Sequence, residues 1–187
     1  MQRYLALVII TFLIILVAAR VLLLKRAGIK AMKFGALDRT DFLLPPFFLF
    51  YLYLLISSVF DLPRIGFEFI RHGGIAWIGV AIAVLGLLLF IMSMVALGKS
   101  FRVGIDKDAP GKLITSGIYA HTRNPIYVAF GLVFFGVFLI VSNWIFLLYL
   151  TFGTLMVNRQ VLREEETLKK IYGAEYLSYL RKVPRYF

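Results

Sequence analysis

Long runs of hydrophobic residues, separated by short polar stretches, dominate the chain. A membrane-spanning helix needs about 20 predominantly apolar residues, because each residue of a helix advances the chain by roughly 1.5 Å. Three runs meet that requirement as single segments, and they occupy residues 4–24, 42–60 and 74–97. Pro45 and Pro46 fall near the start of the second run, where a helix tolerates proline. The pattern therefore predicts three membrane-spanning helices in the first half of the chain.

A fourth apolar tract is too long for one crossing. Residues 124–158 form a stretch of 35 without a charged side chain, and the polar pair Ser142-Asn143 interrupts it. We interpret the tract as two helices, residues 126–141 and 144–157, joined by a tight turn. Each is short of a full crossing unless its ends extend beyond the hydrocarbon core. The sequence thus predicts an all-α membrane protein with five transmembrane helices, of which the last two form a helical hairpin.

The charged tail that follows has a helical pattern of its own. Apolar and aromatic residues recur there at helical spacing, namely Val161, Leu168, Ile171, Tyr172, Tyr176 and Tyr179. This spacing predicts an amphipathic C-terminal helix that is broken or bent near Gly173. On a helical wheel Glu164 and Glu165 fall beside the apolar stripe, whereas Glu166 points away from it. Because a carboxylate close to an apolar face near the membrane is costly without a partner, Glu164 is expected to have one.

Composition supports an integral membrane protein with a single domain, residues 1–187. Hydrophobic residues make up 61% of the chain and charged residues 17%, with a mean hydropathy of +0.87; a soluble domain is about half apolar and a quarter charged. The absence of cysteine excludes disulfides and thiolate chemistry. The net charge is +11. In a membrane protein such an excess sets topology and meets anionic head groups, so we do not expect nucleic-acid binding.

The distribution of Lys and Arg predicts the orientation. If the five spans are correct, one side of the membrane carries 17 of these residues and the other side three, with Arg20 inside the first span. Because basic residues accumulate in the cytoplasm, the N-terminus is expected outside and the charged tail in the cytoplasm, at the inner membrane if the cell is bacterial. The first apolar run precedes its basic cluster, which favours a retained span over a cleaved signal.

The longest polar connection between spans is residues 98–125. A loop of this length in a compact protein is more often a binding loop than a spacer. At its end Asn124 and Pro125 are suited to start a helix, with Asn as the cap and Pro in the first turn. Such a helix start also presents free N–H groups and a positive dipole end to a ligand. His72 and His121 are far apart in the sequence, so no metal site is expected.

Two segments of the chain carry a resemblance to a known enzyme family. The sequence GKLITSGIYAHTRNPIY, residues 111–127, is followed after the charge-free hairpin by REEETLKKIYGAEYLSYLRKVPRYF, residues 163–187. Their order and spacing resemble the isoprenylcysteine carboxyl methyltransferase family, and they are similar to the related phospholipid N-methyltransferases. The resemblance covers residues 97–187; the first two spans are similar only in being spans. It implies S-adenosylmethionine (SAM) as cofactor and S-adenosylhomocysteine (SAH) as product.

The resemblance also implies roles for individual residues, in a cofactor-binding part made of residues 98–127 and 159–187. The implied cofactor-binding residues are Lys112, Leu113, Ile114, Tyr119, Asn124, Pro125, Ile126, Tyr127 and Glu164. The implied catalytic or substrate-facing residues are Arg123, Arg159, Arg163 and Glu165. Two positions depart from the family pattern. Asn124 stands where the family has histidine, and asparagine cannot titrate. The family's substrate-facing arginine falls on Gln160, which leaves either neighbouring arginine as the candidate.

The chemistry of methyl transfer is consistent with these residue types. A carboxylate such as Glu164 suits the ammonium group of SAM, and the faces of Tyr119 and Tyr127 suit the adenine or the sulfonium cation. The acceptor is expected to be lipophilic and to enter from the bilayer. A carboxylate acceptor needs only an arginine to hold it, whereas an amine must first lose a proton, with help from a glutamate.

Three hypotheses therefore stay open. The leading one is a SAM-dependent carboxyl methyltransferase of the isoprenylcysteine type. The second is a phospholipid N-methyltransferase that acts on an amine such as phosphatidylethanolamine. The third, motivated by Asn124 and Gln160, is a catalytically inactive membrane binding or assembly protein of the same fold.

Overall fold

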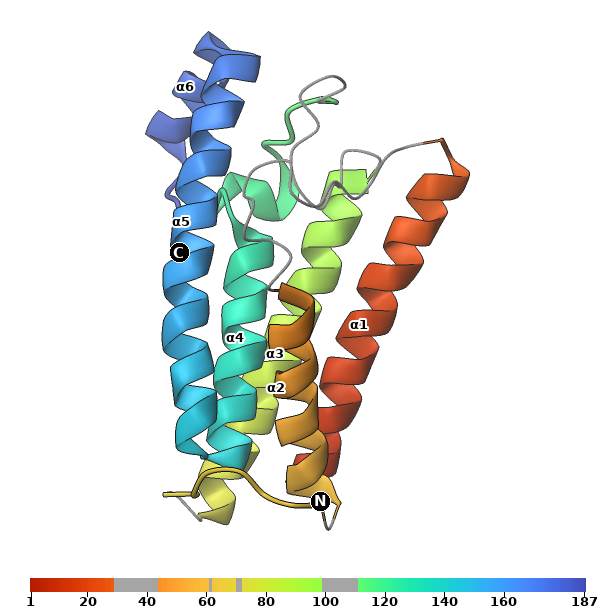
Figure 1. Cartoon of the computed structure of the whole chain (residues 1–187). Helices are drawn as coiled ribbons and strands as arrows, with labels where there is room; N and C mark the ends of the chain where they lie inside the picture. The colour runs from red at the N-terminus through yellow and green to blue at the C-terminus, as the bar shows by residue number, and fades with distance from the viewer. Residues whose placement is uncertain (29–43, 61, 70–71, 99–110) are drawn as a thin grey trace.

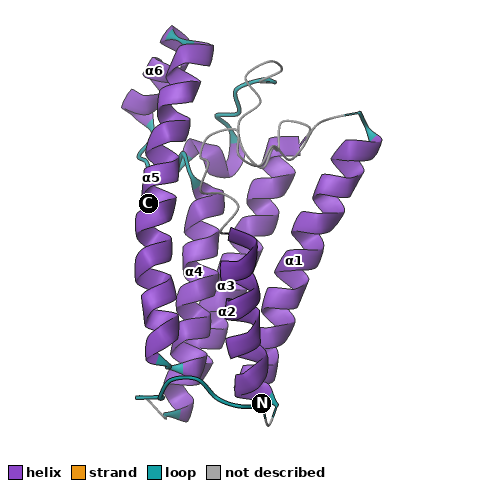
Figure 2. Ribbon diagram, viewed as in Figure 1, coloured by secondary structure: helices purple, strands orange, loops and turns teal. Residues whose placement is uncertain are grey.

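The computed structural model describes residues 1–28, 44–60, 62–69, 72–98 and 111–187, and all regular secondary structure in these ranges is helical. The helices are α1 (Gln2–Arg26), α2 (Leu44–Val59), α3 (Gly73–Leu97), the 3₁₀ helix η3 (Gly117–Ala120), α4 (Pro125–Val141), α5 (Trp144–Tyr172) and α6 (Ala174–Lys182). Figures 1 and 2 show α1 to α5 side by side as a bundle, with α6 at one end of α5. The predicted all-α fold is confirmed for the described residues.

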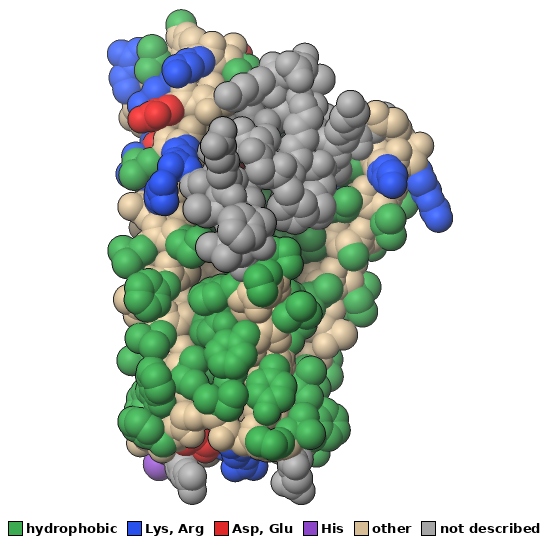
Figure 3. All heavy atoms as spheres, viewed as in Figure 1, with side chains coloured by type: hydrophobic (Ala, Val, Ile, Leu, Met, Phe, Trp, Pro, Cys, Tyr) green, Lys and Arg blue, Asp and Glu red, His purple; other side chains and the backbone are tan. Residues whose placement is uncertain are grey.

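Three of the helices, α1, α3 and α5, are long and apolar enough to cross a membrane. Pro45–Val59 and Pro125–Val141 are shorter apolar helices. On the face drawn in Figure 3, hydrophobic side chains cover the middle of the bundle, and Lys, Arg, Asp and Glu side chains gather at its two ends. This distribution is typical of a membrane protein.

The closest helix pair is α3 and α4, which approach each other through glycines. A Cβ atom added to Gly79 would lie 2.6 Å from the carbonyl oxygen of Gly136, and one added to Gly86 would lie 2.8 Å from that of Ala129. No real side chain tolerates such distances. Small residues allow helix backbones in a membrane to approach closely, where packing replaces the hydrophobic effect as the source of association. The α3–α4 pair therefore forms the rigid centre of the bundle.

The predicted break at Ser142-Asn143 is present between α4 and α5. Ser142 adopts a left-handed conformation with φ 51° and ends α4. The Asn143 side chain accepts a hydrogen bond from Ile145 N (2.9 Å) and so caps α5, and its amide donates to Ile65 O (2.8 Å). The turn is thus fixed both to α5 and to the loop that follows α2.

Helix α5 is longer than the predicted span of residues 144–157. It continues without a break through the charged tail to Tyr172, a length of 29 residues. At about 1.5 Å per residue this exceeds a hydrocarbon core of roughly 30 Å. The tail helix is therefore a continuation of α5 and not a separate element up to Gly173. The expected break at Gly173 is present, because this glycine has φ 53° and separates α5 from α6.

Candidate functional site

The polar residues singled out in the sequence gather at one end of the bundle, where η3 and the start of α4 face the charged part of α5 and α6. Tyr119 of η3 is 7% exposed, and Tyr179 of α6 donates a hydrogen bond to the Tyr119 carbonyl oxygen (2.6 Å). Burial, and then the neighbouring Tyr179 and Glu164, raise the pKa of Tyr119. The phenol of Tyr119 is thus near enough to the carboxylate of Glu164 for the two groups to interact electrostatically.

Glu164 lies on α5 facing the first turn of α4. Its Oε1 atom accepts two hydrogen bonds, from Tyr127 Oη (2.7 Å) and from Gln160 Nε2 (2.9 Å). Its Oε2 atom accepts none from any described residue. Burial raises the pKa of Glu164, although the two hydrogen bonds act in the opposite direction. Among the described residues, one oxygen of this half-buried carboxylate therefore has no hydrogen-bond donor.

Glu165, the next residue, is 3% exposed, and both of its carboxylate oxygens accept hydrogen bonds from arginines. Arg123 donates to Oε1 through Nη2 (2.9 Å) and Nε (3.2 Å). Arg185 donates to Oε1 through Nε (3.1 Å) and to Oε2 through Nη2 (2.8 Å). Burial acts to raise the pKa of Glu165, but the hydrogen bonds and charges of the two arginines outweigh it and lower the pKa below its ordinary value. Glu165 therefore stays ionised, between two cations.

The segment after α6 returns to the start of α4, and we name Val183–Tyr186 the C-terminal strap. Its backbone carbonyl groups accept hydrogen bonds from Arg123 N (to Pro184 O, 3.0 Å), Arg123 Nη1 (to Val183 O, 2.7 Å), Thr122 Oγ1 (to Arg185 O, 3.1 Å) and Asn124 Nδ2 (to Arg185 O, 3.2 Å). Figure 1 shows the C-terminus beside α5. Asn124 and Pro125 occupy the N-cap and first-turn positions of α4, as predicted. The Asn124 side chain, however, makes no capping hydrogen bond and is bound to the strap instead.

The structure brings together six of the predicted site residues: Tyr119, Arg123, Asn124, Tyr127, Glu164 and Glu165. The other predicted residues are more peripheral. Leu113 packs against the buried Tyr176, Tyr179 and Val183. Ile126 packs on the bundle core, and Pro125 is buried at the start of α4. Lys112 and Arg159 are exposed, whereas Ile114 and Arg163 are partly exposed. The middle of the predicted binding loop, residues 99–110, lies outside the described residues.

Sequence reasoning missed Thr122, Arg185 and Tyr186 at this site. Thr122 is completely buried, and Tyr186 donates to Asn158 Oδ1 (3.2 Å) on α5. All three depend on the strap, which has no periodic pattern from which its position could be predicted. Among the described residues there is no group of three or more His, Asp or Glu side chains that could hold a metal ion.

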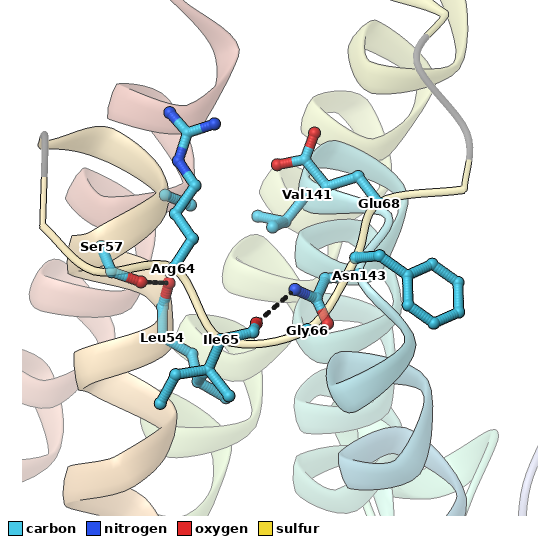
Figure 4. A pocket seen from close by; sticks show the side chains of 10 residues that line it. Leu54, Ser57, Arg64, Ile65, Gly66, Glu68, Val141 and Asn143 are labelled. Carbon is cyan, nitrogen blue, oxygen red and sulfur yellow. Dashed lines mark hydrogen bonds between the residues drawn. The ribbon is translucent and has the colours of Figure 1, made fainter.

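The opposite end of the bundle holds a separate small cavity of about 220 Å³, lined mainly by α2, the loop after it and the α4–α5 turn (Figure 4). Glu68 on its wall forms an ion pair with Arg3 (2.7 Å) at the start of α1. The Asn143 hydrogen bond to Ile65 closes another side. These contacts fasten the loop across the end of the bundle, far along α5 from Glu164.

A sequence model of the family described as phospholipid methyltransferase matches residues 75–175. The match covers more than half of the chain. The chain belongs to the phospholipid methyltransferase family. The matched range contains most of α3 and all of α4 and α5, with Tyr127, Glu164 and Glu165 among its residues. It ends before the C-terminal strap of this family member.

The chain is also similar to three enzymes that are all named protein-S-isoprenylcysteine O-methyltransferase. It is 32% identical over 103 residues to protein-S-isoprenylcysteine O-methyltransferase of Schizosaccharomyces pombe, 54% of this chain and 44% of that protein. It is 27% identical over 119 residues to protein-S-isoprenylcysteine O-methyltransferase B of Arabidopsis thaliana (61% and 59%), and 30% identical over 110 residues to the Xenopus laevis enzyme (57% and 38%). The chain thus spans about 40–60% of the length of these relatives. The family resemblance inferred from the sequence is confirmed.

Proposed function

We propose that this protein is a membrane methyltransferase that transfers a methyl group from SAM to a lipophilic acceptor. Membership of the phospholipid methyltransferase family and similarity to three isoprenylcysteine O-methyltransferases support the reaction class. The observation that carries the proposal to particular residues is the Oε2 atom of Glu164, which accepts no hydrogen bond from any described residue. A half-buried carboxylate with such an acceptor fits a cationic ligand.

In this proposal Glu164 holds the ammonium group of SAM, with Tyr119 and Tyr127 beside it. The tyrosine Oη of Tyr127 and the amide of Gln160 fix the Glu164 carboxylate through Oε1, so that Oε2 points to the ligand. Bound SAM would supply an electrophilic methyl group. The protein's part is then alignment and exclusion of water, since methyl transfer is an in-line displacement. Lys112, Leu113, Ile114, Asn124, Pro125 and Ile126 remain proposed lining residues.

The names of the relatives favour a carboxylate acceptor of the isoprenylcysteine type. A carboxylate is ionised at neutral pH and needs only a cation to hold it. Arg123 forms an ion pair with Glu165. We assign the acceptor to Arg159 or Arg163, because these residues of α5 neighbour Gln160, the position on which the family's substrate-facing arginine falls. Glu165 is equally committed to its two arginines, and we assign it a holding role in place of the catalytic role expected from the resemblance.

A second candidate, phospholipid N-methylation, has one observation in its favour. An amine acceptor must lose a proton, and burial raises the pKa of Glu164, which makes this carboxylate a better base than an exposed one. However, the same carboxylate is the proposed ligand of the cofactor ammonium. The carboxyl methyltransferase is the simpler assignment, because it gives Glu164 a single task.

The proposed topology has five membrane spans with the N-terminus outside and the tail in the cytoplasm. The two shorter apolar helices have 16 and 17 residues, or about 25 Å of helix each at 1.5 Å per residue. This is close to the thickness of the hydrocarbon core. The site then lies at the cytoplasmic surface, where SAM is available to it and where an acceptor in the bilayer can reach the exposed side of α5.

The proposal is tested by binding and product analysis. Calorimetric titration of the detergent-solubilised protein with SAH is expected to show binding, and Glu164→Gln is expected to weaken it about tenfold or more because the charged contact is lost. Glu166→Gln, which neutralises an exposed carboxylate on the same turn, is the matched control. No binding by the folded wild-type protein would support the inactive membrane protein instead.

The acceptor is then identified with labelled SAM. A small prenylated cysteine with a free carboxylate is expected to yield a methyl ester, which base hydrolyses. Phosphatidylethanolamine in mixed micelles would yield a base-stable N-methyl lipid. Label in the second product alone would overturn the carboxyl assignment and support the amine.

A further inference from the structure

We infer that Arg185 is a positioning residue of the methyl-transfer site. From the C-terminal strap it joins Glu165 and Arg123 in a clasp, and this clasp holds Asn124, Tyr127 and Glu164 in their relative positions. The inference rests on the proposed function for the identity of the ligand. The existence of the clasp itself can be tested without any ligand.

The clasp is a buried carboxylate bound by two guanidinium groups. Glu165 is 3% exposed, and its two oxygens accept four hydrogen bonds from the two guanidinium groups. The Arg123 side chain is only 9% exposed, whereas that of Arg185 is 37% exposed. A buried carboxylate between two cations has a fixed geometry, because removal of either partner leaves a desolvated charge. Arg185 is the more accessible partner, and so its substitution can open the clasp with the least damage to the core.

The clasp holds the C-terminal strap against the start of α4. The guanidinium of Arg185 fixes the strap on Glu165, while the backbone of the strap binds the residues before α4. The carbonyl oxygen of Arg185 accepts from Thr122 Oγ1 (3.1 Å) and Asn124 Nδ2 (3.2 Å), and Pro184 O accepts from Arg123 N (3.0 Å). The orientation of the Asn124 side chain is therefore set by the strap and not by helix capping.

Helix α5 connects the clasp to Glu164. Glu164 and Glu165 are consecutive on α5, and consecutive residues of a helix are about 100° apart around its axis. Because Glu165 is held toward Arg123, this turn of α5 has a fixed rotation about the helix axis. In that rotation Glu164 Oε1 accepts a hydrogen bond from Tyr127 Oη (2.7 Å). Tyr186 adds a contact one strap residue further on, with Asn158 of α5 (3.2 Å). Arg185 thus acts on the ligand-binding carboxylate through Glu165 without touching the ligand.

The clasp is tested first by amide hydrogen exchange in the protein without ligand. Arg185→Gln is expected to raise the exchange of the Arg123 amide about tenfold or more, because its acceptor Pro184 O is released with the strap. Arg185→Lys keeps a cation near Glu165 and should recover part of the protection. Arg181→Gln removes one positive charge from an exposed position of α6 and is the matched control. Unchanged exchange in Arg185→Gln would overturn the clasp, whatever the protein binds.

The positioning role is tested next by calorimetry with SAH on the same variants. Arg185→Gln is expected to raise the Kd for SAH about tenfold, with partial rescue in Arg185→Lys and no change in Arg181→Gln. If Arg185→Gln does not fold, Thr122→Val removes one buried donor to Arg185 O and should raise the Kd to a smaller extent. Opened exchange together with an unchanged Kd would overturn the positioning role. Wild-type protein that binds no SAH would overturn the proposed function, and the exchange result would still decide the clasp.

Discussion

Glu164 and Glu165 are neighbours in the chain, yet their surroundings shift their acidities in opposite directions. Glu164 has two neutral donors on one oxygen and none from a described residue on the other, and burial raises its pKa. Glu165 has two arginines, which lower its pKa despite its burial. One carboxylate is therefore suited to exchange a partner, and the other is suited to hold one permanently.

This difference predicts a pH dependence for ligand binding. Because the pKa of Glu164 is raised, the carboxylate takes up a proton at a pH above its ordinary value of 4.5. A protonated carboxyl group no longer attracts an ammonium, so the affinity for SAH is expected to fall as the pH is lowered toward that value. Calorimetry over a pH series measures the effect. The decline should be absent in Glu164→Gln and retained in Glu166→Gln, and a pH-independent wild type would contradict the role of Glu164.

Glu165, whose pKa is shifted in the opposite direction, leads to a prediction about stability. Its folded-state pKa is below 4.5, so its contribution is fully present above pH 4.5 and is lost as the pH falls through the lowered pKa. At neutral pH, Glu165→Ala leaves Arg123 buried without its anion, and the expected cost is about 3–5 kcal/mol. Chemical unfolding in detergent measures it, with Glu166→Ala as the control. Equal stability of the two variants would mean that the arginines find other partners.

At the residue scale, the sequence predicted the direction in which a side chain points from its helix better than it predicted the residues that the side chain contacts. The helical wheel placed Glu164 and Glu165 toward an apolar face and Glu166 away, and the structure has Glu166 exposed and Glu165 buried. Periodicity reports which way a side chain points within its own helix. Periodicity does not predict the position of Arg185, because the strap is irregular. The contact of Arg185 with Glu165 depends on how the chain returns after α6.

At the element scale, the apolar helices were predictable, whereas the true end of α5 was not. The bounds of α1 to α4 lie within a few residues of the apolar runs that predicted them, because hydrophobicity decides where a chain crosses a membrane. Hydropathy falls after residue 157, and the prediction treated the tail as a new element. The residues from 158 to 172 include neither Gly nor Pro, so nothing in the backbone stops the helix before Gly173.

The α3–α4 contact leads to a prediction about packing. A Cβ atom at Gly79 would lie 2.6 Å from Gly136 O, so Gly79→Ala forces the two backbones apart. The expected cost is roughly 1–3 kcal/mol, as for other overpacked cores. Gly131→Ala is the matched control, because a Cβ at that position of α4 has no atom within 4 Å, and it should be neutral or stabilising. Thermal unfolding in detergent compares the two, and equal melting temperatures would contradict the close approach.

At the scale of the whole molecule, the two ends of the bundle are built from different kinds of segment. One end is closed by a short loop, held by the Arg3–Glu68 ion pair and by Asn143. The other carries the charged part of α5, α6 and the strap, where the candidate site lies. The hydropathy pattern along the sequence does not predict this asymmetry, because the asymmetry arises from contacts between segments that are far apart in the chain. The basic residues reveal it indirectly, since the positive-inside rule assigns the site end to the cytoplasm.

The orientation is a testable property of the whole molecule, and the chain is convenient for the test because it has no cysteine. Arg64→Cys places a thiol at the closed end, and Glu166→Cys places one on the exposed face of α5 at the site end. In intact bacterial cells whose outer membrane has been made permeable, a membrane-impermeant maleimide is expected to label Arg64→Cys at once. It should label Glu166→Cys only after the inner membrane is opened, because 17 of the 21 basic residues are assigned to that side. The reverse labelling pattern would place the site outside, where the cell supplies no SAM, and would contradict the proposed function together with the topology.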